Sequence, residues 1–229
     1  MKTSIFVCVL ALSITAIGAA QETPQYEVFV GGSFLRVHAS GAELTQLLDL
    51  SDIQYQPHNM NFNLYGWNAS LAENVNGWLG GEFEASGFYG TVNAGFLFPA
   101  SQLISPSPNF SKLVPVVTRF QTYLGGPRVT LRRSGRVAYF AHLLIGFADV
   151  NTSLNESAIV ATDFSSIPAG TLKSGGGFAV SPGVGIDVRM NERLSIRPIQ
   201  VDYLMSHVFG ERQDNARVSA GLNFTLGHK

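Results

Sequence analysis

The sequence predicts an all-β fold: one eight-stranded antiparallel up-and-down transmembrane β-barrel. Three observations lead to this prediction. Apolar and polar residues alternate in several segments, long and short connections alternate between those segments, and the chain is apolar without containing a long apolar run. The mean hydropathy is +0.16, yet no apolar stretch reaches the roughly 18 residues of a transmembrane helix. Lipid-facing residues at every second position of a strand would produce this combination.

Residues 1–20 are predicted to form a secretory signal peptide. Lys2 supplies the positive charge at its start, and the apolar run Ile5–Ile17, of about 13 residues, is too short to span a bilayer. The segment ends on Gly-Ala-Ala, the kind of small residues that a signal peptidase reads. We therefore expect the barrel domain to comprise residues 21–229. The short apolar run argues against the alternative of an N-terminal membrane anchor.

The composition excludes several kinds of site. Cys8 is the one cysteine and lies inside the predicted signal, so a mature chain would hold no disulfide and a closed barrel must supply its stability. Removing Lys2 from the 15 basic residues leaves 14 against 16 acidic residues, which provides no basic patch for nucleic acid. The five histidines show no metal-ligand spacing. We predict no catalytic residue, no metal site and no cofactor.

Eight segments carry a strand pattern. Their predicted spans are Gln25–Val37, Phe62–Leu71, Gly77–Gly87, Thr118–Arg132, Val137–Asp149, Gly177–Arg189, Leu194–His207 and Ala216–Leu226. In the last segment Leu222 shares an apolar face with its neighbours at every second position, whereas Arg217 and Asn223 share a polar one. The fourth segment is less regular, and we predict a β-bulge at Gly125-Gly126 that shifts its phase.

The connections between these segments alternate in length. Short polar turns are predicted at 72–76, 133–136 and 190–193, long connections at 37–61, 88–117 and 150–176, and a shorter last link at 208–215. Short periplasmic turns and long external loops are typical of barrels in outer membranes. Pro57, Pro106, Pro108 and Pro115 all fall in predicted long connections, where a proline breaks no ladder hydrogen bond.

The two faces of the strands receive different roles in this interpretation. The apolar face should contact lipid, where an arginine or lysine costs about 2–4 kcal/mol at the midplane. Polar and charged residues should therefore point into the lumen, and those predicted there are Glu82, Glu84, Arg128, His142, Asp187, Gln200, Asp202 and Arg217. Because eight strands leave a bore that side chains can fill, we expect an ionic plug. A gated ion path or a catalytic pair is the alternative.

Aromatic residues lie mostly near the predicted strand ends. They are Tyr26, Phe34, Tyr65, Trp67, Trp78, Tyr123, Tyr139, Phe178, Tyr203 and Phe224. Rings at both membrane interfaces would form aromatic girdles. The alternative is that they fill the core of a β-sandwich, where they should lie in mid-strand more often.

Several segments together resemble a known family. They are Leu64-Tyr-Gly-Trp-Asn-Ala-Ser70, Thr122-Tyr-Leu-Gly-Gly-Pro-Arg128, Phe140-Ala-His-Leu-Leu-Ile-Gly146, Ile196-Arg-Pro-Ile-Gln-Val-Asp-Tyr203 and Arg217-Val-Ser-Ala-Gly-Leu-Asn-Phe-Thr-Leu226. In this combination the chain is similar to the small outer-membrane β-barrel proteins, shaped like the transmembrane domain of outer membrane protein A, and looks like barrels common in acidobacteria. The resemblance departs at the closing strand, where a terminal aromatic residue is expected and Gly227-His228-Lys229 follows Leu226.

The resemblance implies an outer-membrane protein of a Gram-negative bacterium. Its partners would be outer-membrane lipid, the barrel-insertion machinery and a surface ligand held by the long loops. We expect a non-enzymatic barrel with a plugged polar lumen and a structural or surface-interaction role, rather than an open porin-like channel. Two alternatives stay open: a lipid-modifying enzyme on the same scaffold, and a soluble lipocalin-like carrier with its apolar face turned inward.

Overall fold

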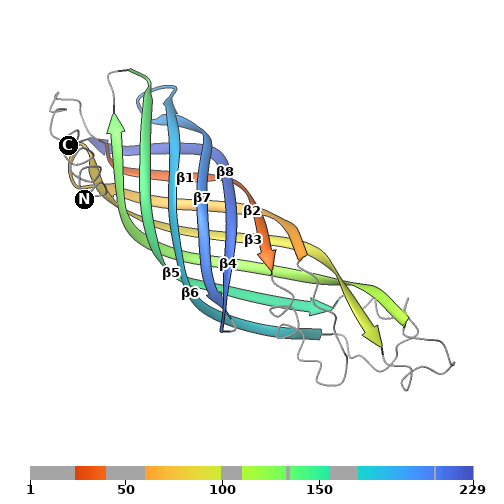
Figure 1. The fold of residues 1–229 in the computed structure, drawn as a ribbon. Coiled ribbons are helices and arrows are strands. Elements are labelled where there is room, and N and C mark those ends of the chain that lie inside the picture. The colour runs from red at the N-terminus through yellow and green to blue at the C-terminus, as the bar shows by residue number, and fades with distance from the viewer. Residues whose placement is uncertain are drawn as a thin grey trace, which may run out of the picture.

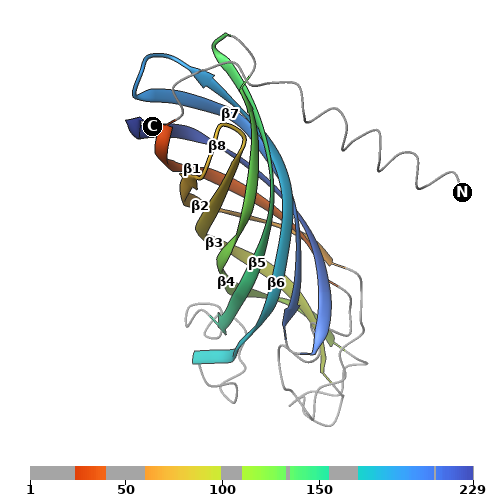
Figure 2. The same ribbon diagram turned by 90° about the vertical axis from the view of Figure 1, so that its left-hand side faces the viewer.

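The protein is a single closed β-barrel in the computed structural model, which describes residues 24–39, 60–98, 110–132, 135–154, 170–208 and 210–228. Each strand pairs antiparallel with its neighbours in sequence, and the first strand pairs with the last (Figure 1). The prediction of eight antiparallel strands in one ring is therefore confirmed. The strands run obliquely around the wall (Figure 2). The predicted signal peptide lies outside the described residues.

The strands are longer than their alternation suggests. Their bounds are β1 Pro24–Ala39, β2 Met60–Asn74, β3 Leu79–Phe98, β4 Phe110–Arg132, β5 Val137–Leu154, β6 Gly170–Arg189, β7 Leu194–Val208 and β8 Glu211–His228. No helix in the described part of the chain is long and apolar enough to cross a membrane.

Three short turns close one end of the barrel, which we call the turn end, and the opposite end is the loop end. Two of the turns share one design. The side-chain oxygen of Asn76 accepts the backbone N–H groups of Trp78 and Leu79, and Asn191 accepts those of Arg193 and Leu194 in the same way. This is how asparagine commonly satisfies the backbone of a tight turn. The predicted turn at 190–193 is confirmed, whereas the turn predicted at 72–76 lies at 75–78 because β2 continues to Asn74.

The loop end differs from the prediction of three long irregular connections. The β3–β4 ladder continues to the pair Phe98–Phe110, so most of the predicted connection 88–117 is strand. The two strands reach beyond the rest of the wall as a ribbon (Figure 1). Pro115 lies within β4 opposite Asn93, not in a loop as predicted. Strands β5 and β6 likewise shorten the predicted connection 150–176, whereas the other three prolines lie outside the described residues.

The predicted β-bulge at Gly125-Gly126 is wrong. Gly125 pairs with Ile145 and Arg128 pairs with His142 in one unbroken register. The irregular appearance of β4 has another cause, since both glycines alternate normally between the two faces and simply carry no side chain to show the pattern.

A β-bulge lies instead in β7. Arg197 pairs with Gly221 and Gln200 pairs with Ser219 of β8, so two residues of β7, including Pro198, stand opposite one of β8. The extra residue changes which side chains face inward. As a result, Arg197 and Gln200 are both fully buried although their positions differ by an odd number.

The outer surface is apolar and carries the predicted aromatic side chains. One girdle near the loop end takes one ring from each of β1 to β7: Phe34, Tyr65, Tyr89, Tyr123, Phe147, Phe178 and Tyr203. Polar residues such as Arg36, Asn63 and Asp149 follow directly beyond it. The predicted aromatic residues within strands alternate with buried neighbours and point outward, and Trp78 is exposed in the β2–β3 turn. The sandwich-core alternative is therefore wrong.

The lumen has two layers, and the prediction of a polar lumen holds for only one of them. The half near the turn end is charged. The half near the loop end is filled mainly by Leu35, Val37, Leu64, Phe88, Val116, Phe120, Leu124, Leu144, Ala148, Val150, Ala179, Leu204 and Val208. Near the loop end both faces of several strands are apolar, as at Phe34 and Leu35. Alternation therefore cannot reveal an apolar interior behind an apolar exterior.

Candidate functional site

The charged half of the lumen is the candidate functional site. Its buried charged residues, which we call the lumen network, are Glu27, Glu82, Glu84, Arg128, Arg132, His142, Asp187, Arg197, Asp202 and Arg217. All eight residues predicted to face inward are buried, Gln200 among them. Every strand contributes to the site, because β2 supplies the uncharged donors Asn68 and Asn74.

At the turn end, Glu27 is held between two arginines. Arg128 Nη2 lies 3.1 Å from Glu27 Oε2 and 3.1 Å from Asp187 Oδ2. Arg132 Nη2 lies 2.6 Å from Glu27 Oε1. Asn223 Nδ2 also donates to Glu27, at 3.1 Å. Strands β1, β4, β6 and β8 are thus tied together across the lumen.

Deeper in the lumen, Arg197 is stacked between two aromatic rings. Its guanidinium carbon lies 4.3 Å from the ring centre of Phe29 and 4.1 Å from that of Phe140. The guanidinium carbon of Arg128 lies 4.2 Å from the centre of the same Phe140 ring. A Cβ atom at Gly185 would clash with the Phe140 ring, so this glycine provides the space for the stack. Such cation–π contacts are strongest where water is excluded.

The centre of the network is an ion triad formed by side chains of β3, β5 and β7. His142 Nδ1 lies 2.9 Å from Glu82 Oε2, and its Nε2 lies 2.7 Å from Asp202 Oδ1. Gly183 of β6 lies between β5 and β7 and pairs with both His142 and Asp202. A Cβ atom at Gly183 would clash with both side chains. Because carboxylates only accept hydrogen bonds, both ring nitrogens donate and the imidazole carries a positive charge.

Arg217 lies at the end of the lumen network that borders the apolar half of the lumen. Its Nη2 donates to Glu84 Oε2 at 2.9 Å, and its Nε donates to Asp202 Oδ2 at 2.9 Å. With His142 charged, the lumen network contains five cations and five carboxylates. The network is therefore neutral as a whole, as a site removed from water requires.

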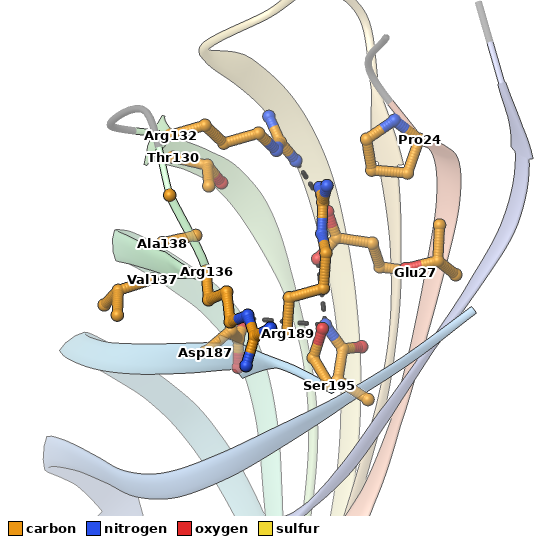
Figure 3. Close-up of a pocket in the computed structure, with 13 residues that line it drawn as sticks. Pro24, Glu27, Thr130, Arg132, Arg136, Val137, Ala138, Asp187, Arg189 and Ser195 are labelled. Atoms are coloured by element: carbon orange, nitrogen blue, oxygen red, sulfur yellow. Dashed lines mark hydrogen bonds and ion pairs between the residues drawn. The ribbon is translucent and has the colours of Figure 1, made fainter. Parts of the chain in front are cut away.

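A small cavity opens at the turn-end mouth of the lumen (Figure 3). Its volume is about 30 Å³, which suits a single water molecule. Glu27, Asp187 and three arginines line it, namely Arg132, Arg136 and Arg189. Among the described residues, no group of histidine, cysteine or acidic side chains has the arrangement of a metal site.

A separate polar group lies on the outer surface, just beyond the girdle. The Tyr203 hydroxyl donates to Asp214, and Arg212 Nε lies 2.9 Å from the same carboxylate. The Tyr203 hydrogen bond and then the Arg212 charge hold the pKa of Asp214 below its ordinary value near 3.8. This exposed group belongs to the boundary of the apolar belt and not to the lumen.

Three members of the lumen network were missed by sequence reasoning: Glu27, Arg132 and Arg197. The bulge hides Arg197, because counting by two from Gln200 places it on the outer face. Glu27 lies on β1, whose two faces are both largely apolar. Charge balance was the available signal. The predicted inward set had four acids against two arginines and one histidine, so even with the histidine charged it needed one more cation to be neutral.

Comparisons with known proteins place the fold. No family model matches the chain, and no characterised protein matches it in sequence. Among solved structures, neisserial surface protein A superposes with a TM-score of 0.52 at 7% identity, covering 90% of this chain and 99% of that one. Ail, the attachment invasion locus protein of Yersinia pestis, gives a TM-score of 0.45 at 12% identity and 87% and 99% coverage. The protease OmpT of Escherichia coli gives 0.40 at 10% identity and 91% and 99% coverage.

The chain has the fold of the small outer-membrane β-barrels. This confirms the resemblance for the fold class, while the specific likeness to outer membrane protein A is loose. At these identities the likeness concerns the fold alone.

Proposed function

We propose that this protein is a closed outer-membrane β-barrel that conducts no solute and has a structural or surface-interaction role. The observation that carries the proposal is the filled lumen. A neutral ionic network occupies the turn-end half, and apolar side chains occupy the loop-end half. An ion crossing the lumen would have to separate buried ion pairs and then enter an apolar layer, each of which costs several kcal/mol.

The outer surface supports the membrane location. Large apolar side chains are exposed around the wall, for example Leu143 at 45%, Val184 at 58% and Leu222 at 42%. In water such a continuous belt would be an aggregation hazard, whereas in lipid it is the expected surface. Short turns lie on the periplasmic side of outer-membrane barrels, so the loop end would face the medium.

The projecting β3–β4 ribbon supports the surface-interaction role. Beyond the pair Tyr65–Tyr89, β3 has no ladder partner on the β2 side among the described residues, while it stays paired with β4 up to Phe98. The ribbon therefore extends past the wall of the barrel (Figure 1). Placed outside the cell, it is the part of the described chain best positioned to meet a ligand.

The arrangement of groups favours a non-enzymatic role over the two alternatives. His142 is buried and engaged by two carboxylates, and the adjacent pair Ser206 and His207 point to opposite faces, one buried and one exposed. A lipocalin-like carrier would need an apolar pocket inside a polar exterior, whereas here the exterior is apolar and the lumen is filled by side chains, with charged groups in its turn-end half.

Conductance in planar bilayers tests the proposal. We expect almost no steady current from the unmodified protein, with an open porin as the positive control. We expect Arg217→Ala to leave the current close to zero as well, because the apolar layer in the loop-end half still fills the lumen. Large and stable single-channel currents from the unmodified protein would show an open lumen and favour a porin function. Recovery of the protein in the soluble periplasmic fraction would contradict the membrane location.

A further inference from the structure

Two arginines at the turn-end mouth are surplus to the lumen network. Arg136 and Arg189 lie at the ends of the paired strands β5 and β6, where the backbone N–H of Arg189 donates to the carbonyl of Arg136 at 2.6 Å. Both side chains line the mouth with Arg132 (Figure 3). Both residues are exposed, and neither side chain has a hydrogen-bond or ion-pair partner among the described residues.

The acids at the mouth cannot serve as their counter-ions. Glu27 is already bound by Arg128 and Arg132, and Asp187 is bound by Arg128 and Arg197. Since the lumen network is neutral without them, Arg136 and Arg189 add two uncompensated positive charges at one place. The mouth therefore has a net attraction for anions.

Like charges on directly neighbouring strands destabilise a sheet. A bound anion would turn this unfavourable pair into a favourable one. Guanidinium groups match the oxygen geometry of phosphate through paired hydrogen bonds. The hydroxyls of Ser195 and Thr225 line the same mouth and can donate further hydrogen bonds. The enclosed volume of about 30 Å³ holds only a water, so the anion would sit at the open rim above it.

We propose that Arg136 and Arg189 form a phosphate-binding site at the turn-end mouth of the barrel. The phosphate could be a free oxyanion or the headgroup of an anionic phospholipid at the adjacent membrane surface, and both present the same oxygens. The inference does not depend on the proposed function, because a barrel with or without conductance would carry the same site.

The test uses the full chain folded in zwitterionic detergent without phosphate. Inorganic phosphate is titrated in and followed by calorimetry and by ³¹P line broadening. We expect saturable binding that weakens at least about tenfold in the double variant Arg136→Gln/Arg189→Gln, the loss expected for a charge-assisted hydrogen bond. Arg193→Gln is the matched control, because Arg193 is exposed in the β6–β7 turn at the same end but does not line the mouth. It should change the affinity less than about twofold.

A second arm distinguishes the two sources of phosphate. The unmodified protein is placed in nanodiscs of phosphatidylcholine with or without phosphatidylglycerol. If phosphatidylglycerol suppresses phosphate binding in the unmodified protein, the headgroup is the ligand. If it has no effect, the ligand is a free oxyanion. Absence of saturable binding, or equal binding by the double variant, would overturn the proposal. Heat-modifiable migration on gels confirms that each variant is folded.

Discussion

The replacement Arg217→Met is the sharpest test of the lumen network. Arg217 is fully buried and is the charged partner of both Glu84 and Asp202. Methionine keeps much of the side-chain length but removes the charge. Glu84 would then keep only amide donors, such as Asn68 at 3.1 Å. Removing one partner of a buried ion pair costs about 3–5 kcal/mol, because a charge stays buried without compensation.

The free energy of unfolding in lipid vesicles measures this loss. Urea titration followed by tryptophan fluorescence is suitable, since Trp67 and Trp78 both lie on the outer surface. Arg212→Met is the matched control on the same strand. Arg212 also pairs with an aspartate, but the pair is exposed, so its removal should change the stability little.

A double variant separates the ion pair from simple packing. In Arg217→Met/Glu84→Gln the carboxylate is neutralised together with its partner. We expect the combined loss to be smaller than the sum of the two single losses, because the uncompensated charge is gone. The reasoning would be refuted if Arg217→Met cost less than about 1 kcal/mol, or if Arg212→Met cost as much.

Three further predictions concern the two faces and the outer surface. Leu222→Arg should destabilise the inserted barrel by about 2–4 kcal/mol in vesicle unfolding, since it places a cation in lipid, whereas Leu222→Met should be nearly neutral. Gly183→Ala should cost about 1.5–3 kcal/mol by forcing apart the buried histidine–aspartate contact, while Gly32→Ala, which meets only open space, should not; equal losses would contradict the role of the glycine. The Asp214 carboxyl should titrate below pH 3.8 by NMR, so its contribution to folding is present at neutral pH and is lost as the pH falls through that lowered pKa. Tyr203→Phe should move the midpoint back upward, and an unchanged midpoint would exclude the hydrogen bond as the main cause.

Strand number, ring closure and the orientation of single residues were predictable, because period two is a local property. Leu222 faces outward and Asn223 inward, as their alternation indicates. The contacts within the site were not predictable. Arg217 and Glu84 are 133 positions apart in the chain, and they meet across the lumen because of the stagger between strands, which local alternation does not encode.

The errors also have local causes. Alternation reports a difference between two faces, so it fails where both are apolar, as at Phe34 and Leu35. It also fails where a bulge changes the phase, as at Arg197. The part of the β3–β4 ladder beyond the apolar belt was predicted to be a loop. Outside the belt, the two faces of a strand no longer contact lipid on one side and the lumen on the other, so the alternation is lost. The surplus of Arg136 and Arg189 depends on how Glu27 and Asp187 are paired across the lumen, which the sequence does not encode.

The lumen network takes charged residues from seven strands and hydrogen-bond donors from β2, so its contacts depend on the number of strands in the ring. A sheet that lacks β8 lacks Arg217, and Glu84 of β3 then has no cation within its reach. A sheet with an additional strand would widen the bore and separate groups that now meet at 2.7–3.1 Å. The ion pairs that cross the lumen, such as Arg217–Glu84 and Arg128–Glu27, can form only when the ring closes, so partly assembled sheets do not gain them. The same charges that block the bore would thus select a ring of eight strands over rings of other sizes.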